Sequence, residues 1–203
     1  MSRHLLRLVI LTLAIGLACP AFSHAQEPDS DKYEIFGGFS AYHVDVGDDP
    51  FGLGSWAYGA IAEFTWFPID WFGIGGEVAY HQYSPGFPPN LFVGGSVGVS
   101  QSTFLAGMRF RYKNSSRFVP SGHVKMGLGH ATASVSLRPL VPWIPPVDED
   151  LGDNAFAVVL GGALDINVTD RIAIRAIQPD IVITTYEDAS ADLRISTGLL
   201  VRF

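Results

Sequence analysis

The chain has 203 residues, which is enough for one domain of ordinary size. It carries 13 Lys and Arg against 20 Asp and Glu, a formal net charge of −7, and this disfavours nucleic acid as a partner because the phosphate backbone is also negative. The mean hydropathy of +0.25 is high, yet no segment beyond the N-terminus approaches the roughly 18 consecutive apolar residues that a spanning helix needs.

The N-terminus has the pattern of a secretory signal peptide. Arg3 and Arg7 precede a short apolar run over residues 8–18, and Ser23-His24-Ala25 is a small-x-small cleavage site. The pattern predicts a signal peptide over residues 1–25 that is cleaved after Ala25.

The predicted mature domain spans residues 26–203. Removal of the signal peptide leaves 11 basic against 20 acidic residues, a net charge of −9. Cys19 offers an alternative, a lipoprotein anchor, although Gly16 stands where a lipobox normally has a leucine-like residue and Pro20 follows. Cleavage after Ala25 would leave a mature chain without cysteine, and therefore without disulfide or thiol chemistry.

From residue 33 onward, apolar residues alternate with small or polar ones, which is typical of strands. Each alternating segment is about as long as a tilted membrane strand, which needs roughly 9–11 residues. The segments cover residues 33–43, 56–66, 72–82, 101–112, 119–130, 155–166, 171–182 and 191–203.

The two faces of each predicted strand differ in character. In the second segment, Trp56, Tyr58, Phe64 and Trp66 share one face, and Glu63 lies on the other. A soluble periplasmic barrel with its aromatic face inside is the alternative, because alternation alone does not distinguish the two. The gaps between the segments are alternately long and short, which favours an all-β, eight-stranded antiparallel up-and-down transmembrane β-barrel.

Aromatic residues gather near the predicted strand ends, where a membrane interface favours rings that are apolar on one side and tolerate water on the other. Core aromatics of a soluble β domain are the alternative. The predicted group at the short-turn end is Tyr33, Trp66, Phe67, Trp71, Phe72, Tyr112, Phe118 and Phe203, and the group at the long-loop end is Tyr42, Trp56, Tyr58, Tyr80, Tyr83 and Phe156.

Residues 33–43, YEIFGGFSAYH, resemble the opening strand of small outer-membrane β-barrel proteins of the OmpA-like or porin-family type. Residues 175–180 and the final LRISTGLLVRF resemble the last hairpin of the same group. The resemblance implies a bacterial outer-membrane location, contact with outer-membrane lipid, and an assembly signal at Leu199, Val201 and Phe203 that the barrel-assembly machinery reads. It implies no single activity.

Two further features bear on the strands and their interior. Pro179 cannot donate to a ladder, so we expect a bulge there or a position facing the rim. Eight strands leave an interior just wide enough for side chains. The charged residues predicted to point inward are Glu34, Glu63, Glu77, Arg109, Arg111, Lys125, Asp165, Arg175, Arg194 and Arg202.

Glu63 and Glu77 fall on the two neighbouring strands of one predicted hairpin. The cations that neutralise them must therefore come from strands across the lumen. Because an unpaired buried charge is costly, we expect ion pairs and hydrogen bonds to plug the interior. This favours a structural or surface-interaction protein. A small porin-like channel for ions or small solutes is the alternative.

A lipid-modifying enzyme at the rim is a third, more distant alternative. It would need a nucleophile, a base and an orienting group within reach of one another. The candidates are His43 with Asp45, Asp48 and Ser55, and His130 with Ser134. None carries a hydrolase signature, so the sequence predicts no enzyme.

No cofactor or metal site is predicted either. The acidic groups Asp48-Asp49 and Asp148-Glu149-Asp150 with Asp153 lack calcium-loop spacing, and acidic loop tips are usually solvated. They could instead bridge divalent ions to lipopolysaccharide.

The most distinctive predicted loop contains RPLVPWIPPV over residues 138–147. Its prolines stiffen the segment, and Trp143 with Leu140, Val141 and Ile144 forms an apolar tip. We expect Trp143 to contact a surface ligand of unknown identity, a lipid or the barrel mouth. A loop folded back over its own barrel is the alternative.

Overall fold

The computed structural model describes residues 32–44, 55–83, 93–112, 116–139, 147–185 and 189–203. These residues form eight strands. No helix among the described residues is long and apolar enough to cross a membrane. The strands are β1 (Tyr33–Val44), β2 (Ser55–Ile69), β3 (Phe72–Tyr83), β4 (Val93–Arg111), β5 (Phe118–Pro139), β6 (Val147–Asn167), β7 (Ile172–Thr185) and β8 (Ala189–Arg202).

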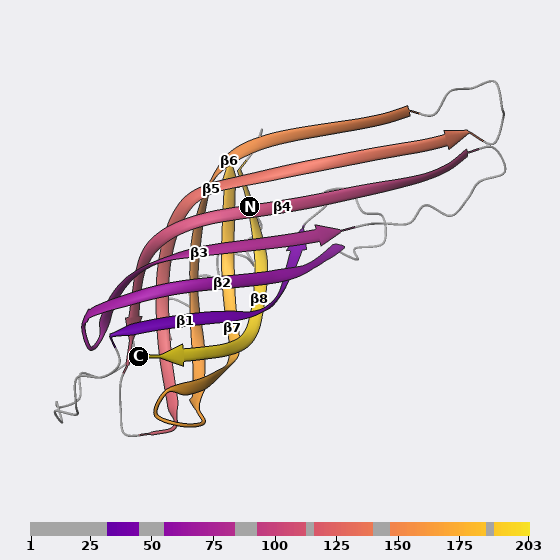
Figure 1. Cartoon of the computed structure of the whole chain (residues 1–203). Helices are drawn as coiled ribbons and strands as arrows, with labels where there is room; N and C mark the ends of the chain where they lie inside the picture. Colours follow the sequence, from indigo (N-terminus) through magenta and orange to yellow (C-terminus); the bar gives the residue numbers. More distant parts are fainter. Residues whose placement is uncertain (1–31, 45–54, 84–92, 113–115, 140–146, 186–188) are drawn as a thin grey trace, which may run out of the picture. The chain divides into compact units, whose positions relative to one another are not determined.

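The strands close into a barrel in chain order, and every pairing is antiparallel (Figure 1). At the seam between β1 and β8, the N–H of Tyr33 donates to the carbonyl of Phe203 at 2.9 Å, and the N–H of Phe203 donates back to the carbonyl of Tyr33 at 3.0 Å. The predicted eight-stranded antiparallel barrel is confirmed. Its short-turn end is the end that carries the turns at residues 70–71 and 168–171 and both seam residues.

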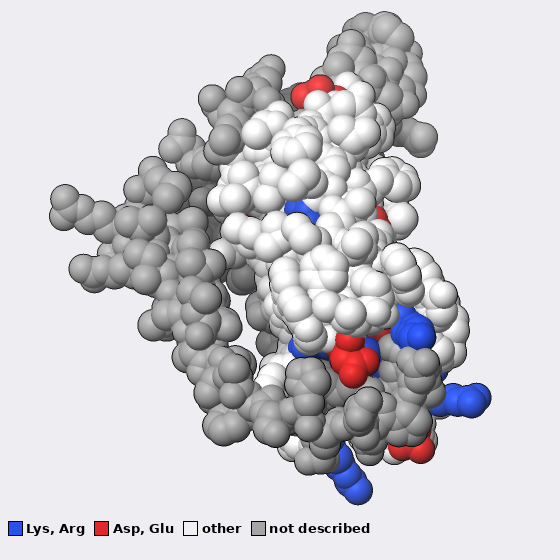
Figure 2. Space-filling view, turned by 90° about the vertical axis from the view of Figure 1, so that its left-hand side faces the viewer, with Lys and Arg blue, Asp and Glu red and all other residues white. Residues whose placement is uncertain are grey.

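Burial alternates along the strands as the sequence pattern predicts. On β3, Glu77 and His81 are buried inside the barrel, whereas Val78 and Tyr80 on the outer face are about half exposed. Figure 2 shows the outcome on one side of the molecule, where residues other than Lys, Arg, Asp and Glu cover most of the described surface. The barrel therefore has a polar interior and an apolar outer wall, the reverse of a soluble domain.

Strands β4, β5 and β6 are longer than predicted. The ladder between β4 and β5 runs from Arg111 opposite Ser121 to Val93 opposite Pro139, whereas β3 pairs with β4 only as far as Tyr83 opposite Val99. The three strands extend beyond the rest of the barrel (Figure 1). Much of the predicted third loop is therefore strand. On its β5 side, Ala131, Ala133 and Val135 continue the alternation of apolar and polar residues, and the predicted strand ended too early.

A β-bulge interrupts β7. The register shifts between Arg175 and Gln178 on the side of β8, and the two residues between them, Ala176 and Ile177, both face outward. The hydroxyl of Thr197 donates to the Arg175 carbonyl at 2.9 Å. The bulge thus lies just before Pro179, as expected, and it shifts the alternation of β7 by one residue.

Aromatic rings stack on the outer wall at the short-turn end. Tyr33 stacks on Phe64 and on Phe203, with ring centroids 6.1 and 5.8 Å apart. Three predicted members of the aromatic groups are wrong, because Phe67 and Tyr42 are buried inside the barrel and Tyr83 packs against the same buried residues as Tyr42. Phe67 lies under the Arg111 guanidinium, and the Tyr42 hydroxyl donates to Asp192 at 2.9 Å.

Candidate functional site

The lumen holds a balanced set of buried charges. All ten members of the predicted inward set are buried, with 0–6% of their surface exposed. The structure adds two carboxylates that the sequence prediction left out, Asp180 and Asp192. The described buried residues therefore comprise six acids (Glu34, Glu63, Glu77, Asp165, Asp180 and Asp192) and six bases (Arg109, Arg111, Lys125, Arg175, Arg194 and Arg202), a net formal charge of zero when histidine is neutral.

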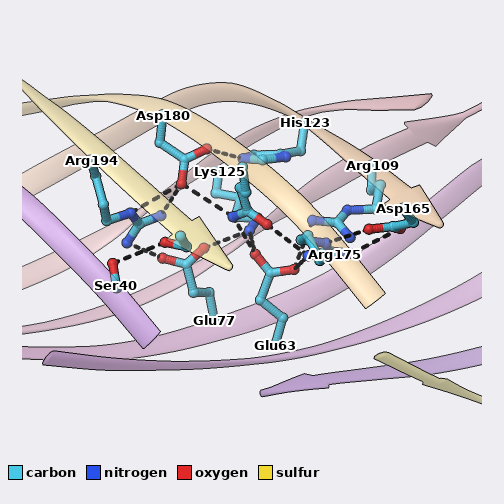
Figure 3. Close-up of polar contacts among 12 residues, drawn as sticks. Ser40, Glu63, Glu77, Arg109, His123, Lys125, Asp165, Arg175, Asp180 and Arg194 are labelled. Carbon is cyan, nitrogen blue, oxygen red and sulfur yellow. Dashed lines mark hydrogen bonds and ion pairs between the residues drawn. The ribbon is translucent and has the colours of Figure 1, made fainter. Parts of the chain in front are cut away.

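Glu63 lies at the centre of this network (Figure 3). Its Oε2 accepts hydrogen bonds from Arg109 Nη2 at 2.7 Å and from Arg175 Nη1 at 2.8 Å. Its Oε1 accepts from Gln178 Nε2 at 2.9 Å and from the ammonium of Lys125. One carboxylate therefore joins donors from β4, β5 and β7, which lie on other walls of the barrel.

Glu77 connects this centre to β7 and β8. It is directly opposite Glu63 on the neighbouring strand and pairs with Lys125 Nζ at 2.5 Å and with Arg194 Nη1 at 2.5 Å. Arg194 Nη2 also bonds to Asp180 Oδ2 at 2.7 Å. The like-charged neighbours are thus neutralised from across the lumen, as two buried carboxylates require.

Asp180 also pairs with a histidine. Its Oδ1 lies 2.8 Å from Nε2 of His123 on β5. The pair occupies space left by Gly161, where a Cβ would approach Asp180 Oδ1 to 2.0 Å and His123 Nε2 to 2.9 Å. Glycine at this position therefore lets β6 pass beside the pair.

A second group of charges lies near the short-turn end. Glu34 Oε1 accepts from Arg111 Nη1 at 2.7 Å and from Arg202 Nε at 2.9 Å. The Arg111 guanidinium also lies 3.8 Å from the ring centroid of Phe67, a cation–π contact. Arg202 makes a further hydrogen bond to Asn167. We call this group of contacts, which joins Glu34, Arg111, Arg202, Asn167 and Phe67 near the short-turn end of the lumen, the floor.

The floor and the centre are linked by Arg175. Its Nε donates to Asp165 Oδ1 at 2.7 Å, while its Nη1 reaches Glu63. Its guanidinium lies 4.2 Å from the ring centroid of Phe36. Ion pairs and rings therefore alternate along this part of the lumen.

An apolar cluster of buried side chains lies beside the network and extends toward the long-loop end. The cluster includes Tyr42, near the end of β1, and Ala57, near the start of β2. Its members have at most 6% of their surface exposed. The cluster is not wholly apolar, because the Tyr42 hydroxyl within it donates to the buried Asp192 at 2.9 Å. The cluster is formed by Tyr42, Ala57, Leu105, Ala157, Val159 and Val182.

The predicted catalytic candidates that the structure describes make other contacts. His43 lies on β1 and packs against Trp56, with ring centroids 4.9 Å apart. Ser55 lies at the start of β2, and Asp45 and Asp48 are outside the described residues, as is Asp49. His130 lies on β5 and contacts Asn154 Oδ1 at 2.9 Å and Thr132 Oγ1 at 3.2 Å. Ser134 is also on β5 and not on a loop.

Another Ser–His pair lies inside the barrel. Ser40 Oγ is 2.9 Å from His81 Nε2, with 0% and 2% of the two residues exposed. His81 Nδ1 has no hydrogen-bond partner among the described residues, so no acid orients the ring. The pair therefore lacks both substrate access and the third group that a hydrolase needs.

The other predicted site residues are placed as follows. Asp148, Glu149, Asp150 and Asp153 lie on β6 and not on a loop tip. Within the described ranges, no three or more His, Cys, Asp or Glu residues are grouped to hold a metal ion. Leu199, Val201 and Phe203 face outward. Trp143 lies outside the described residues, as do Leu140, Val141 and Ile144.

Solved structures share this fold. The attachment invasion locus protein Ail of Yersinia pestis matches with a TM-score of 0.55 and 16% identity over 86% of this chain and 100% of that chain. Ail in complex with the heparin analogue sucrose octasulfate matches with a TM-score of 0.56 and 14% identity over the same shares. Neisserial surface protein A matches with a TM-score of 0.51 and 9% identity, over 87% of this chain and 100% of that chain.

No protein-family model matches the chain, and no curated protein matches it in sequence. At identities of 9–16%, the structural likeness establishes the fold alone. The chain has the fold of a small outer-membrane β-barrel.

Proposed function

We propose that this protein is a bacterial outer-membrane barrel with a sealed lumen and a structural or surface-interaction role. One observation carries the proposal: charged side chains lie inside the barrel and apolar side chains cover its outer wall. Twelve Asp, Glu, Lys and Arg side chains are buried inside, while the exposed large residues of the wall are apolar, among them Phe64, Phe104 and Leu128. Such a wall suits lipid, whereas in water an apolar surface of this size would promote aggregation.

The sealed lumen is supported by three groups of buried side chains. The floor around Glu34 lies nearer the short-turn end than the network around Glu63. The apolar cluster lies against that network, since Leu105 is directly opposite Glu77 and Val159 is directly opposite Lys125. A small porin-like channel would need all three to open. We therefore favour a scaffold that presents its surface over a barrel that conducts.

The role at the surface depends on the long-loop end. The sequence there carries nine acidic residues and one basic residue, Arg138, which favours a cationic partner over an anionic one. Ail forms a complex with a polysulfated heparin analogue, and such a ligand suits this chain poorly. The acids are Asp45, Asp48, Asp49, Asp148, Glu149, Asp150, Asp153, Glu187 and Asp188.

We also infer export by a cleaved signal peptide over residues 1–25, assembly through Leu199, Val201 and Phe203, and no catalytic role. Cell fractionation followed by N-terminal sequencing tests location and processing together. We expect the protein in the outer membrane with Gln26 as its first residue. A soluble periplasmic protein would overturn the proposed location. A lipid-modified N-terminus at Cys19 would overturn the proposed processing.

A further inference from the structure

Three buried polar atoms on β4 and β5 point to a binding site that the ion-pair network does not use. Arg109 Nε, Ser121 Oγ and His123 Nδ1 are each buried and have no hydrogen-bond partner among the described residues. Buried polar groups are nearly always satisfied, so unsatisfied ones at neighbouring positions indicate a small ligand. We propose that these three residues bind a small monovalent anion, such as chloride, which enters as His123 takes up a proton.

Strand register brings the three residues together. Arg109 is directly opposite His123 in the ladder between β4 and β5, and Ser121 is opposite Arg111, one inward position away. Arg109 and His123 each have 3% of their surface exposed. Figure 3 shows the side chains of Arg109 and His123 on the same side of Glu63. The three atoms therefore belong to one patch of the lumen wall.

Arg109 and His123 each already have a partner at another nitrogen atom. Arg109 Nη2 bonds to Glu63 at 2.7 Å, and His123 Nε2 lies 2.8 Å from Asp180 Oδ1. Because a carboxylate only accepts, Nε2 must carry the hydrogen of that bond. The state of Nδ1 then depends on whether the ring is neutral or protonated.

Hydrogen-bond chemistry distinguishes two occupants. With a neutral ring, the site offers one donor from Arg109, one acceptor from His123 and a hydroxyl that can do either, which matches a water molecule. With a protonated ring, Arg109 Nε, Ser121 Oγ and His123 Nδ1 can all donate. Three donors in one patch of the lumen wall suit an anion that only accepts.

Charge balance also links anion binding to protonation of His123. His123 faces Asp180 from β7, Glu63 from β2, Arg109 from β4 and Lys125 from its own strand. The six buried acids and six buried bases cancel, so a proton on His123 leaves one excess positive charge. One monovalent anion restores neutrality, whereas the same anion beside a neutral ring would be an uncompensated buried charge. The site would exist whether or not the barrel conducts.

Bromide is a direct probe of this site, because it replaces chloride and is located by anomalous scattering. The full mature protein is refolded and crystallised in sodium bromide at about pH 8 and at a series of acidic pH values down to about 3, so that the series extends well below the pH at which a free histidine takes up its proton. We expect an anomalous peak within hydrogen-bond reach of Arg109 Nε, Ser121 Oγ and His123 Nδ1 in the acidic crystals alone. No peak at any acidic pH would overturn the site, and an equal peak in the alkaline crystals would overturn the coupling.

A solution measurement keeps the test independent of crystals. Bromide, compared with sulfate at equal ionic strength, should raise the thermal unfolding midpoint in detergent at acidic pH. Ser121→Ala keeps every ion pair and should weaken the apparent bromide affinity by about tenfold, as expected for one lost hydrogen bond to a charge. Ser102→Ala, on the outward face of β4, is the matched control and should bind as the wild type does. Equal bromide responses in the wild type and both variants would overturn the proposal.

Discussion

Glu63 and Glu77 face each other directly across β2 and β3, and the ammonium of Lys125 on β5 bonds to both. Two carboxylates at adjacent inward positions repel each other unless a cation lies between them. Lys125 supplies that cation from another wall of the barrel. The contact therefore neutralises the pair and ties β5 to the β2–β3 hairpin through the lumen.

Replacement of Lys125 tests this contact. Lys125→Met keeps most of the side-chain volume but leaves Glu63 and Glu77 with one cation fewer. We expect the free energy of unfolding to fall by about 3–5 kcal/mol, the usual cost of breaking a buried ion pair on one side. Urea titration of the protein refolded in lipid vesicles measures the change.

Arg171→Met is the control for this substitution, since Arg171 is exposed in the turn before β7. It should change the free energy of unfolding by no more than about 0.5 kcal/mol. Equal effects of Lys125→Met and Arg171→Met would show that the network does not stabilise the barrel.

The bulge in β7 gives a second prediction. Thr197→Val preserves shape but removes the hydroxyl that donates to the Arg175 carbonyl. In a lipid-facing wall, that carbonyl would lose a partner that no water replaces, so we expect a loss of about 1–3 kcal/mol in unfolding free energy. If Thr197→Val unfolds with the same free energy as the wild type, the hydroxyl has no role at the bulge.

The apolar wall gives a third prediction, which separates a membrane barrel from a soluble one. Val78 and Gln82 both face outward on β3, Val78 near the middle and Gln82 toward the long-loop end. Val78→Arg should reduce the free energy of folding into lipid bilayers by about 2–4 kcal/mol, and Gln82→Arg by about 1 kcal/mol or less. Were the two substitutions equally harmless, the wall would face water.

The seam gives a fourth prediction. Tyr33 and Phe203 exchange two backbone hydrogen bonds and stack their rings, and so join the first and last strands. A double-mutant cycle with Tyr33→Ala and Phe203→Ala should give a coupling energy of about 0.5–1.5 kcal/mol in unfolding free energy. Additive effects of the two substitutions would show that the stacking does not help to close the barrel.

The eight strands and their inward charges could be predicted because burial in a barrel wall follows a strict period of two. Position Asp180 illustrates where this period fails. Counting in twos from Arg175 points Ile177 and Pro179 inward, but the bulge adds a residue and turns Gln178 and Asp180 inward instead. Nothing in the residue pattern before Pro179 fixes where the extra residue lies.

Two other buried residues, Asp192 and His123, could have been predicted from the alternation in the sequence. Asp192 shares the inward face with Arg194 and Arg202, and His123 lies two residues before Lys125. Both therefore follow from simple alternation. Their partners do not, because contacts across the lumen depend on strand stagger and closure. The outer parts of β4 and β5 were also within reach, because Val97 and Val99 and then Ala133 and Val135 continue the alternation. The outer part of β6 is acidic and lacks an apolar face.

Planar-bilayer conductance of the refolded mature chain, after a heat-dependent gel shift has confirmed a folded barrel, tests the sealed lumen most directly. The floor at Glu34, the network at Glu63 and the apolar cluster at Val159 predict a folded protein that gives no discrete current steps. Stable, discrete steps would contradict the account and favour the porin-like channel.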